Sequence, residues 1–318
     1  MHIKKFLEEN NIPYSVDEPL HKVTGMNLPG KISILARPIN VCQLSLLYNY
    51  IIENQISYEI LGGLSNTYLC SFFDRDIVVR TINVKEIIRG DKEICVGCGC
   101  NLTQLSKELS REGVAGFEGL IGIPGTVGAA AINNSGAFDS VMSDLVKGVT
   151  IITKQGVELF LSNKELHYST RNSVLKGNDF GVLLSVTIDV SKHADPQIIS
   201  DKIVRYTSIR RRDIDGKRKS LGSIISGHTI QNIWRENKIA NIIRKVIYAP
   251  FKRTRFRKKM QCFSEFIVLG GRRFIKHCDN IGRFCWTKNT REEDFLDYID
   301  FIKSKSNNTI ELEIEIKR

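Results

Sequence analysis

Hydrophobic and polar positions along the chain follow two periods, that of a strand and that of a helix. Alternating or short continuous apolar runs predict strands over residues 31–38, 58–61, 76–84, 93–96, 146–153, 157–161, 180–190 and 309–316. Helical spacing predicts helices over residues 41–55, 102–112, 196–212, 238–248 and 292–304, after a polar helix and an extended segment within the first 20 residues. The order predicts an α+β fold, because the regular strand–helix–strand repeat of a doubly wound sheet is absent from the pattern.

The composition is that of a globular protein and excludes several other classes. With 42% hydrophobic and 25% charged residues in 318 positions, the chain is neither disordered nor collagen-like nor a coiled coil, and it is long enough for two or three domains. Apolar runs stay below the roughly 18–20 residues that a membrane-spanning helix needs. The charged start MHIKKFLEENNIPY and the spacing of the eight cysteines predict a cytoplasmic protein with reduced thiols.

The positive charge is concentrated in one stretch of the chain. Between Arg205 and Lys259 there are 17 basic and three acidic residues, a balance of +14 against +11 for the whole chain, so the remainder carries about −3. Such a stretch suits nucleic acid, an anionic membrane surface or a nucleotide diphosphate as a partner. A solvated helix surface is the alternative.

Two glycine-rich segments are candidates for binding a phosphate-containing cofactor. The first, LGGLSN at 61–66, follows a predicted strand, and its glycines let the backbone approach phosphate closely. The second, within 116–136, contains a tight Pro-Gly-Thr turn at 124–126 that suits a planar cofactor with a diphosphate. Neither segment has the Rossmann or P-loop spacing, and a close-packed glycine turn is the structural alternative.

Three motifs taken in order resemble the UDP-N-acetylenolpyruvoylglucosamine reductase (MurB) family: LGGLSN at 61–66, GIPGTVGAA at 122–130 and NSGAF at 134–138. The resemblance implies the α+β FAD-binding fold shared with vanillyl-alcohol oxidase-type enzymes, with two flavin-binding subdomains at 1–80 and 81–207 and a smaller α+β substrate domain at 208–318. It also implies that FAD is contacted by Gly62, Gly63, Ser65, Asn66, Pro124, Gly125, Thr126, Gly128, Asn134 and Gly136.

The same resemblance implies an activity. The family uses NADPH and FAD to reduce the enolpyruvyl ether of UDP-N-acetylglucosamine to UDP-N-acetylmuramate, a peptidoglycan precursor. An enolate forms in that reaction, which requires a cation at the carboxylate, a proton donor and a polar partner for the enolate. By resemblance these are Arg171, Ser223 and Glu315, in the segments RNS, GSII and LEIEI. A monomer without a nucleic-acid partner is expected.

The chain departs from the family pattern at several positions. Thr170 and Phe138 stand where the family has tyrosine, and Ala129 stands where it has glycine. After Ser223 the chain continues with two isoleucines instead of phenylalanine, a lysine and an Asn-Pro pair. These departures motivate two alternatives: a diverged FAD-dependent oxidoreductase acting on another nucleotide sugar for surface polysaccharide, or a non-catalytic flavin-fold binding module.

Two further features have more than one interpretation. Cys95, Cys98 and Cys100, with a cysteine from 262, 278 or 285, match a tetrahedral zinc site in number, whereas small buried cysteines near the flavin are the favoured interpretation. The basic residues that could face the diphosphate of a UDP-sugar and the phosphates of NADPH are Arg210, Arg211, Arg212, Lys217, Arg218 and Lys219. Residues 251–259 interleave aromatic and basic residues as single-strand nucleic-acid binders do, although a solvated or membrane-facing patch is favoured.

Overall fold

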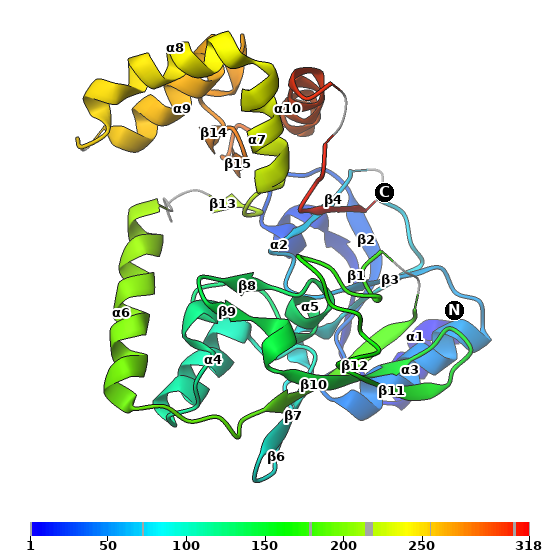
Figure 1. Ribbon diagram of the computed structural model, residues 1–318. Coiled ribbons are helices and arrows are strands. Elements are labelled where there is room, and N and C mark those ends of the chain that lie inside the picture. Colours follow the sequence, from blue (N-terminus) through cyan, green and yellow to red (C-terminus); the bar gives the residue numbers. More distant parts are fainter. Residues whose placement is uncertain are drawn as a thin grey trace. The chain divides into compact units, whose positions relative to one another are not determined.

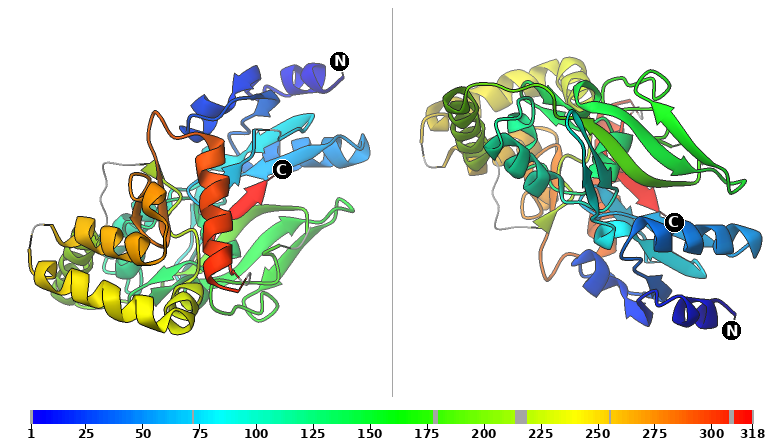
Figure 2. Two further views of the ribbon diagram at one scale, coloured as in Figure 1. Left: turned by 90° about the horizontal axis from the view of Figure 1, so that it is seen from above. Right: turned by 90° about the horizontal axis from the view of Figure 1, so that it is seen from below.

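The chain folds into two units, each assembled from segments that are distant in the sequence (Figures 1 and 2). The computed structural model describes residues 2–71, 73–177, 180–213, 219–254, 256–307 and 310–317. The first unit consists of Met1–Glu18, Ile32–Gly63 and Arg75–Arg212. The second unit consists of Pro19–Lys31, Leu64–Asp74 and Asp213–Arg318.

A four-stranded sheet with the order β1–β2–β5–β3 forms one part of the first unit. Its strands and the two helices of this part are β1 (Tyr14–Pro19), β2 (Lys31–Ala36), β3 (Tyr58–Leu61), β5 (Ile77–Arg80), α1 (His2–Glu9) and α3 (Val41–Glu53). Strand β5 is parallel to both β2 and β3, and α3 makes the crossover between those two. Asn40 begins α3, because its side chain accepts a hydrogen bond from the Gln43 amide at 2.7 Å.

A five-stranded antiparallel sheet with the order β11–β10–β12–β7–β6 forms the other part of the first unit. Its strands are β6 (Ile87–Arg89), β7 (Glu93–Gly97), β10 (Val146–Ile152), β11 (Glu158–Ser162) and β12 (Val182–Asp189). The accompanying elements are α4 (Leu102–Arg111), α5 (Val127–Ile132), α6 (Pro196–Asp213), the hairpin β8 (Gly136–Ala137) and β9 (Ser140–Val141), and the 3-10 turns η1 (Thr81–Asn83), η2 (Glu118–Leu120) and η3 (Met142–Asp144).

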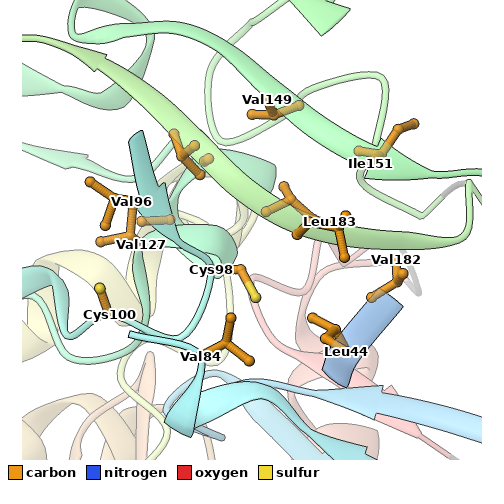
Figure 3. Close-up of a cluster of buried hydrophobic side chains, with 14 of the residues drawn as sticks. Leu44, Val84, Val96, Cys98, Cys100, Val127, Val149, Ile151, Val182 and Leu183 are labelled. Carbon is orange, nitrogen blue, oxygen red and sulfur yellow. The ribbon is translucent and has the colours of Figure 1, made fainter. Parts of the chain in front are cut away.

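One hydrophobic core runs through the first unit and joins its two sheets (Figure 3). Leu44 of α3, Val127 of α5 and Val182 of β12 belong to the same buried cluster. Val149 of β10 lies opposite Leu161 on one side and Val186 on the other, so the sheet presents a continuous row of branched side chains. The glycine-rich segments are therefore held by a rigid, close-packed framework.

The second unit combines two small sheets with four longer helices. Its elements are α2 (Leu20–Thr24), β4 (Thr67–Leu69), β13 (Lys219–Ser220), α7 (Gly227–Glu236), α8 (Lys238–Tyr248), η4 (Ala249–Phe251), α9 (Arg257–Val268), η5 (Arg272–Phe274), β14 (Cys278–Asn280), β15 (Arg283–Trp286), α10 (Glu292–Lys305) and β16 (Glu315–Lys317). Strands β13, β15 and β14 form an antiparallel sheet, and β16 pairs in parallel with β4.

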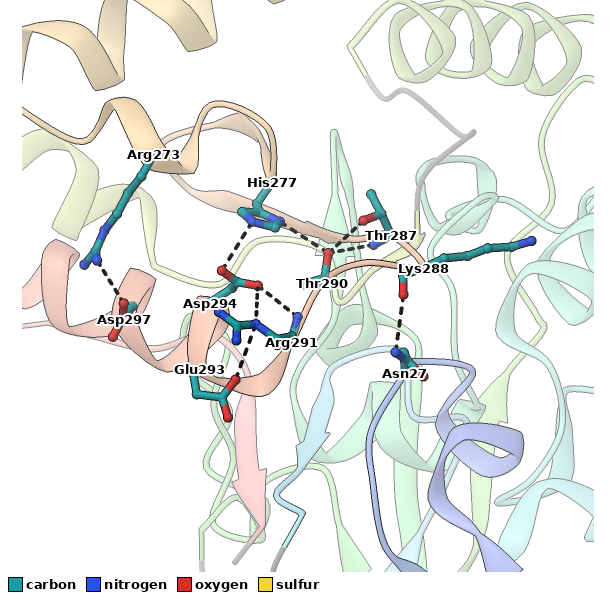
Figure 4. Close-up of polar contacts among 10 residues, drawn as sticks. All are labelled: Asn27, Arg273, His277, Thr287, Lys288, Thr290, Arg291, Glu293, Asp294 and Asp297. Carbon is teal, nitrogen blue, oxygen red and sulfur yellow. Dashed lines mark hydrogen bonds and ion pairs between the residues drawn. The ribbon is translucent and has the colours of Figure 1, made fainter.

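An aromatic core stabilises the second unit. Phe284 of β15 contacts Phe295 and Tyr298 of α10 at ring-centroid distances of 5.3 and 5.2 Å. The start of α10 is fixed by polar contacts (Figure 4), since Asp294 accepts a hydrogen bond from the Arg291 amide at 2.9 Å and lies 3.6 Å from Nε2 of His277. Helix α10 thus seals the sheet from one side.

The α+β prediction is confirmed, and most predicted elements are present. The predicted helices at 41–55, 102–112, 196–212, 238–248 and 292–304 correspond to α3, α4, α6, α8 and α10. The predicted strand over 309–316 is wrong in its extent, because β16 covers only Glu315–Lys317 and Leu312 forms an isolated bridge with Ile225. Among the described residues, no helix combines the length and the apolar content that crossing a bilayer requires.

Candidate functional site

The two glycine-rich segments meet in the first unit. Gly62 and Gly63 directly follow β3, and Gly125 precedes α5. A Cβ atom on Gly63 would lie 3.3 Å from Cα of Gly125, and one on Gly62 would lie 3.1 Å from Oγ1 of Thr126. The backbones of the two turns are therefore in direct contact, and larger side chains at these positions would push the turns apart. Gly125 has φ +116°, a conformation that favours glycine, and Pro124 at the tip of its turn is exposed.

Close packing against the cysteine-rich strand end fixes the second glycine segment. The Thr126 side chain begins α5 by accepting a hydrogen bond from the Ala129 amide at 3.3 Å. The Gly128 amide donates to the carbonyl of Cys98 at 2.9 Å, and a Cβ atom on Gly128 would lie 2.8 Å from Cβ of Cys98. Thr126 and Gly128 are buried and pack against the core, whereas Pro124 at the tip of the turn is exposed.

Asn134 joins the glycine segment to the segment that carries Arg171. Its side chain is 5% exposed, donates to the Ser169 carbonyl at 2.8 Å and accepts from the Ser143 amide at 2.9 Å. Gly136 lies in the β8–β9 hairpin, where a Cβ atom would meet the Ser140 carbonyl oxygen at 2.8 Å. The structure thus gives both residues a positioning role in the framework around the candidate site.

Arg171 lies in a strained turn of the first unit. It is exposed, and its φ of +56° belongs to the left-handed region that costs non-glycine residues about 1–3 kcal/mol. The turn is closed by a bridge between Ser169 and Asn172, which the Asn134 side chain holds from below. Strain of this kind is typical of functional positions, where the surrounding structure imposes it.

Arg210 of α6 adds a second cation to this part of the first unit. Its Nη2 donates to the Gly119 carbonyl at 2.8 Å, and its guanidinium carbon lies 5.2 Å from the ring centroid of Phe138. Burial lowers the pKa of the Arg210 guanidinium, and the positive charge of Arg171 lowers it further. The two arginines are thus close enough to repel each other, and such a pair is suited to a bound anion.

Phe138 and the basic residues of α6 extend this surface. Phe138, which stands where the family has tyrosine, is 46% exposed and stacks on Tyr206 with ring centroids 4.2 Å apart. Arg211 is exposed, and Lys219 lies in the second unit. The predicted phosphate partners Lys217 and Arg218, and the side chain of Arg212, lie outside the described residues.

The second unit brings together three other predicted site segments. The Asn66 side chain donates to the Glu313 carbonyl at 2.7 Å, and the Glu315 amide donates to the Asn66 carbonyl at 3.0 Å. The Ile224 carbonyl, next to Ser223, accepts from the Glu313 amide at 3.0 Å. Ser223 is exposed after Gly222, whose φ is +79°. The half-buried Ser65 belongs to the same unit.

Buried polar atoms test whether the first unit suits a bound cofactor. The atoms of the first unit that have no hydrogen-bond partner within the described part of the chain include Oδ1 of Asn133, the hydroxyl of Tyr168 and Nε of Arg210. Buried polar atoms are normally paired, so each is an open position for a ligand or for water. Together with the half-buried backbone of Gly62, Gly63 and Gly125, they fit the FAD that the motifs imply. The motifs did not identify Asn133 or Tyr168.

The cysteine-rich segment behaves as a buried part of the framework. Cys98 and Cys100 are 3% and 5% exposed, and burial raises the pKa of their thiols to about 12 and about 11. Among the described residues, no group of three or more His, Cys, Asp or Glu side chains is arranged to hold a metal ion. Cys98 and Cys100 are therefore buried, as the favoured interpretation expects, whereas Cys95 is half-buried.

A small cavity in the second unit was not anticipated from the sequence. It has a volume of about 110 Å³, and its lining includes Lys219, Leu221, which directly precedes Gly222, and Trp286. Small-molecule sites usually measure roughly 300–1,000 Å³, so this cavity cannot enclose a nucleotide sugar by itself. Its lining comes from four separate stretches of chain, and only Leu64 among the lining residues belongs to one of the glycine motifs.

Comparisons with known proteins agree with the motifs. The FAD binding domain family matches residues 32–162. A UDP-N-acetylenolpyruvoylglucosamine reductase of Clostridioides difficile (strain 630) is 32% identical over 180 residues, which are 56% of this chain but only 58%, less than two thirds, of that protein. The reductase of the same name from Bacillus pumilus (strain SAFR-032) is 27% identical over 209 residues, 65% of this chain and 69% of that protein.

A solved structure is similar over nearly the whole chain. The crystal structure of UDP-N-acetylenolpyruvylglucosamine reductase (MurB) from Thermus caldophilus aligns with a TM-score of 0.66 and 21% sequence identity. The alignment covers 96% of this chain and 99% of that chain. At this identity the similarity establishes a shared fold.

Proposed function

Because the chain is a divergent member of the UDP-N-acetylenolpyruvoylglucosamine reductase family, we propose that it is an NADPH-dependent flavoenzyme that reduces the enolpyruvyl ether of UDP-N-acetylglucosamine to UDP-N-acetylmuramate. The observation that carries the proposal is the direct backbone contact between the turns at Gly63 and Gly125, because two segments distant in the sequence meet without side chains between them. The joined turns present a surface with few side chains, on which a diphosphate could approach the backbone closely.

The residues that would hold FAD are the ones that the motifs identify. FAD, when bound, supplies the redox chemistry of the reaction by accepting hydride from NADPH and delivering it to C3 of the enolpyruvyl group. The open faces of Gly62, Gly63, Pro124 and Gly125 would approach the cofactor, with Ser65 and Asn66 at the same turn. Thr126, Gly128, Asn134 and Gly136 would keep the cradle rigid.

The chain's own side chains would manage charge and protons on the substrate. The Arg171 guanidinium would neutralise the substrate carboxylate, whose charge grows as the enolate forms. The Ser223 hydroxyl would give its proton to C2, and the serine would regain a proton from water. A free serine is a very weak acid, so this transfer depends on the basicity of the enolate and on neighbouring groups. The Glu315 side chain would lie beside the enolate and orient it.

A second candidate function rests on the segment after Ser223. Ile224 and Ile225 are fully buried there, and Ser226 begins α7 by accepting a hydrogen bond from the Thr229 amide at 3.1 Å. The family has a lysine and an Asn-Pro pair in this segment, so a polar surface is replaced by a packed one. This difference favours a flavin-dependent oxidoreductase acting on another nucleotide sugar. A binding module without catalysis would bind flavin and polyanions but would turn over no substrate.

We also propose a location, a domain division and an assembly state. We place the protein in the cytoplasm as a monomer that uses a UDP-sugar and NADPH and has no nucleic-acid partner. The flavin-binding subdomains would be residues 1–80 and 81–207, and the substrate domain residues 208–318.

The test separates the two half-reactions in single-site variants. Ser223→Ala should leave flavin reduction by NADPH unchanged and should stop reoxidation by the enolpyruvyl substrate, whereas the exposed control Ser304→Ala should change neither. Arg171→Gln should raise the KM for the substrate, and the exposed control Arg111→Gln should not. Normal reoxidation in Ser223→Ala would refute the assignment of the proton donor.

A further inference from the structure

Helix α8 (Lys238–Tyr248) carries an aliphatic stripe that faces solvent. Ile239, Ile242, Ile243 and Val246 are 76%, 64%, 46% and 68% exposed. Their spacing places them on one face of the helix, and none of the residues of α8 is fully buried. Soluble helices normally turn such a face toward the core, so this exposed aliphatic stripe requires an explanation.

Polar contacts on the opposite face fix this orientation. The Arg244 guanidinium lies 3.9 Å from the ring centroid of Trp234 in α7, and its Nε donates to Oδ1 of Asn241 at 3.0 Å. The Asn241 side chain in turn donates to the Trp234 carbonyl at 3.2 Å. Helix α8 therefore packs on its neighbours through an arginine and an asparagine, and the isoleucines point away from them. Figures 1 and 2 show α8 alongside α9, at the rim of the helices of this unit.

The stretch of chain that contains the stripe is strongly basic. From Lys238 to Ser264 the sequence contains nine lysines and arginines and no acidic residue. Lys238 and Lys245 are exposed on α8 itself, and Lys252 and Arg253 are exposed just beyond η4. An aliphatic face bordered by cations is the pattern of a helix that lies in the interface of an anionic membrane.

We propose that the aliphatic stripe of α8 and its basic border dock this protein reversibly on an anionic phospholipid bilayer. The aliphatic side chains would enter the boundary between headgroups and acyl chains, and the lysines and arginines would pair with lipid phosphates. Nucleic acid fits less well, because phosphate and sugar would leave four branched aliphatic side chains in water. An acidic protein would satisfy the charges but would also need an apolar patch that matches the stripe, whereas a bilayer accommodates the stripe without one. The proposal is independent of the reductase activity.

The test is vesicle binding by the full-length protein. Sedimentation should recover the protein with vesicles of equal parts phosphatidylglycerol and phosphatidylcholine, and not with vesicles of phosphatidylcholine alone. The double variant Ile242→Ser/Val246→Ser should weaken binding by at least about tenfold, because it removes two membrane-facing side chains. Its matched control is Ile198→Ser/Val204→Ser in α6, whose side chains are 55% and 67% exposed and which should bind as the wild type does.

A charge variant and a salt titration complete the test. Lys238→Gln/Lys245→Gln should weaken vesicle binding. Raising NaCl from ~50 mM to ~500 mM should release the wild-type protein from anionic vesicles, because salt screens the attraction. The control is Lys107→Gln/Lys164→Gln at exposed positions elsewhere. Far-UV circular dichroism and thermal unfolding verify that each variant is folded, which is expected because every replaced side chain is exposed.

Three results would overturn the proposal. The first is no binding to anionic vesicles at low salt. The second is unchanged vesicle binding by Ile242→Ser/Val246→Ser, which would mean a general attraction to polyanions such as RNA. The third is a stable dimer in analytical ultracentrifugation that this double variant converts to a monomer, because the stripe would then be covered by a second copy of the chain.

Discussion

Replacing Gly128 with alanine is expected to destabilise the first unit, although alanine normally favours a helix. The new Cβ atom would lie 2.8 Å from Cβ, 3.0 Å from the carbonyl oxygen and 3.2 Å from Cα of Cys98. Most of these atoms belong to the backbone of Cys98, which donates and accepts hydrogen bonds in the framework, so the neighbour cannot rotate away. The steric overlap can be relieved only if α5 and the end of β7, next to Cys98, move apart.

Two opposing effects determine how much Gly128→Ala changes the free energy of unfolding. Alanine in place of glycine stabilises a helix by about 1 kcal/mol, whereas overpacking a close contact destabilises by about 1–3 kcal/mol. Because the new contact is shorter than 3.0 Å and most of the atoms met are backbone, the overpacking loss should lie in the upper half of that range, about 2–3 kcal/mol. The net loss in the free energy of unfolding is then about 1–2 kcal/mol, which lowers Tm by about 2–8 °C for a unit of this size. The control is Gly227→Ala at the start of α7, where no atom lies within 4 Å of the added Cβ, and its stability should match or exceed that of the wild type.

The assay is thermal or urea unfolding followed by circular dichroism, in a double-mutant cycle with Cys98→Gly. Removing Cβ of Cys98 eliminates the shortest contact, so Gly128→Ala should destabilise less in that background, with a coupling of about 0.5–1 kcal/mol. FAD affinity should fall in Gly128→Ala and stay unchanged in Gly227→Ala. Wild-type stability of Gly128→Ala, or strictly additive effects in the cycle, would refute the close packing described here.

Three further predictions concern other parts of the framework. Asn134→Ala should lower the free energy of unfolding by about 1–3 kcal/mol, because two backbone groups lose their partner, and it should weaken substrate binding; urea unfolding and KM measure both. Burial raises the pKa of Glu265, so its carboxyl binds a proton more readily in the folded protein than in the unfolded chain. The contribution to stability is therefore present below the ordinary carboxyl pKa and is lost as pH rises through the raised value, and Glu265→Gln should show a flatter pH profile of Tm. In the native protein at pH 8, a thiol reagent should modify the exposed Cys42 rapidly and should reach Cys98 and Cys100 only after unfolding, while a chelator should leave Tm unchanged.

Periodicity predicted the elements whose burial follows the pattern of the sequence. Helix α8 has the predicted bounds 238–248, and α10 extends one residue beyond its predicted end at 304. Hydrophobic periodicity identifies a helical stripe but does not specify whether that stripe faces the core or the solvent. In α8 the choice depends on the stack of Arg244 on Trp234, which is a tertiary contact.

Periodicity missed the elements that tertiary contacts create. Helix α5 has the sequence VGAAAI, which lacks a polar face, and it forms because the Thr126 side chain begins it and its small residues pack closely. The C-terminal strand is short because its partner β4 has only three residues, and the segment before it pairs instead with Ile224 and Ile225.

The candidate site could be predicted only as far as its motifs extend. The glycine segments at 62–63 and 122–128 were identified from their sequence, and the contact between them follows from the absence of side chains. The hydrogen bonds that join Asn66 to the C-terminal segment link residues that lie 247 or more positions apart, and no local pattern encodes them. Asn133 and Tyr168 were missed because an unpaired buried atom is a property of the folded protein.

We propose that this chain uses a bound flavin to reduce an enolpyruvyl UDP-sugar. The direct test is anaerobic: the purified protein is loaded with FAD, reduced with NADPH and mixed with the enolpyruvyl ether of UDP-N-acetylglucosamine while the flavin absorbance is followed. We expect prompt return of the oxidised flavin spectrum together with formation of UDP-N-acetylmuramate. A flavin that stays reduced after addition of this substrate would contradict the account.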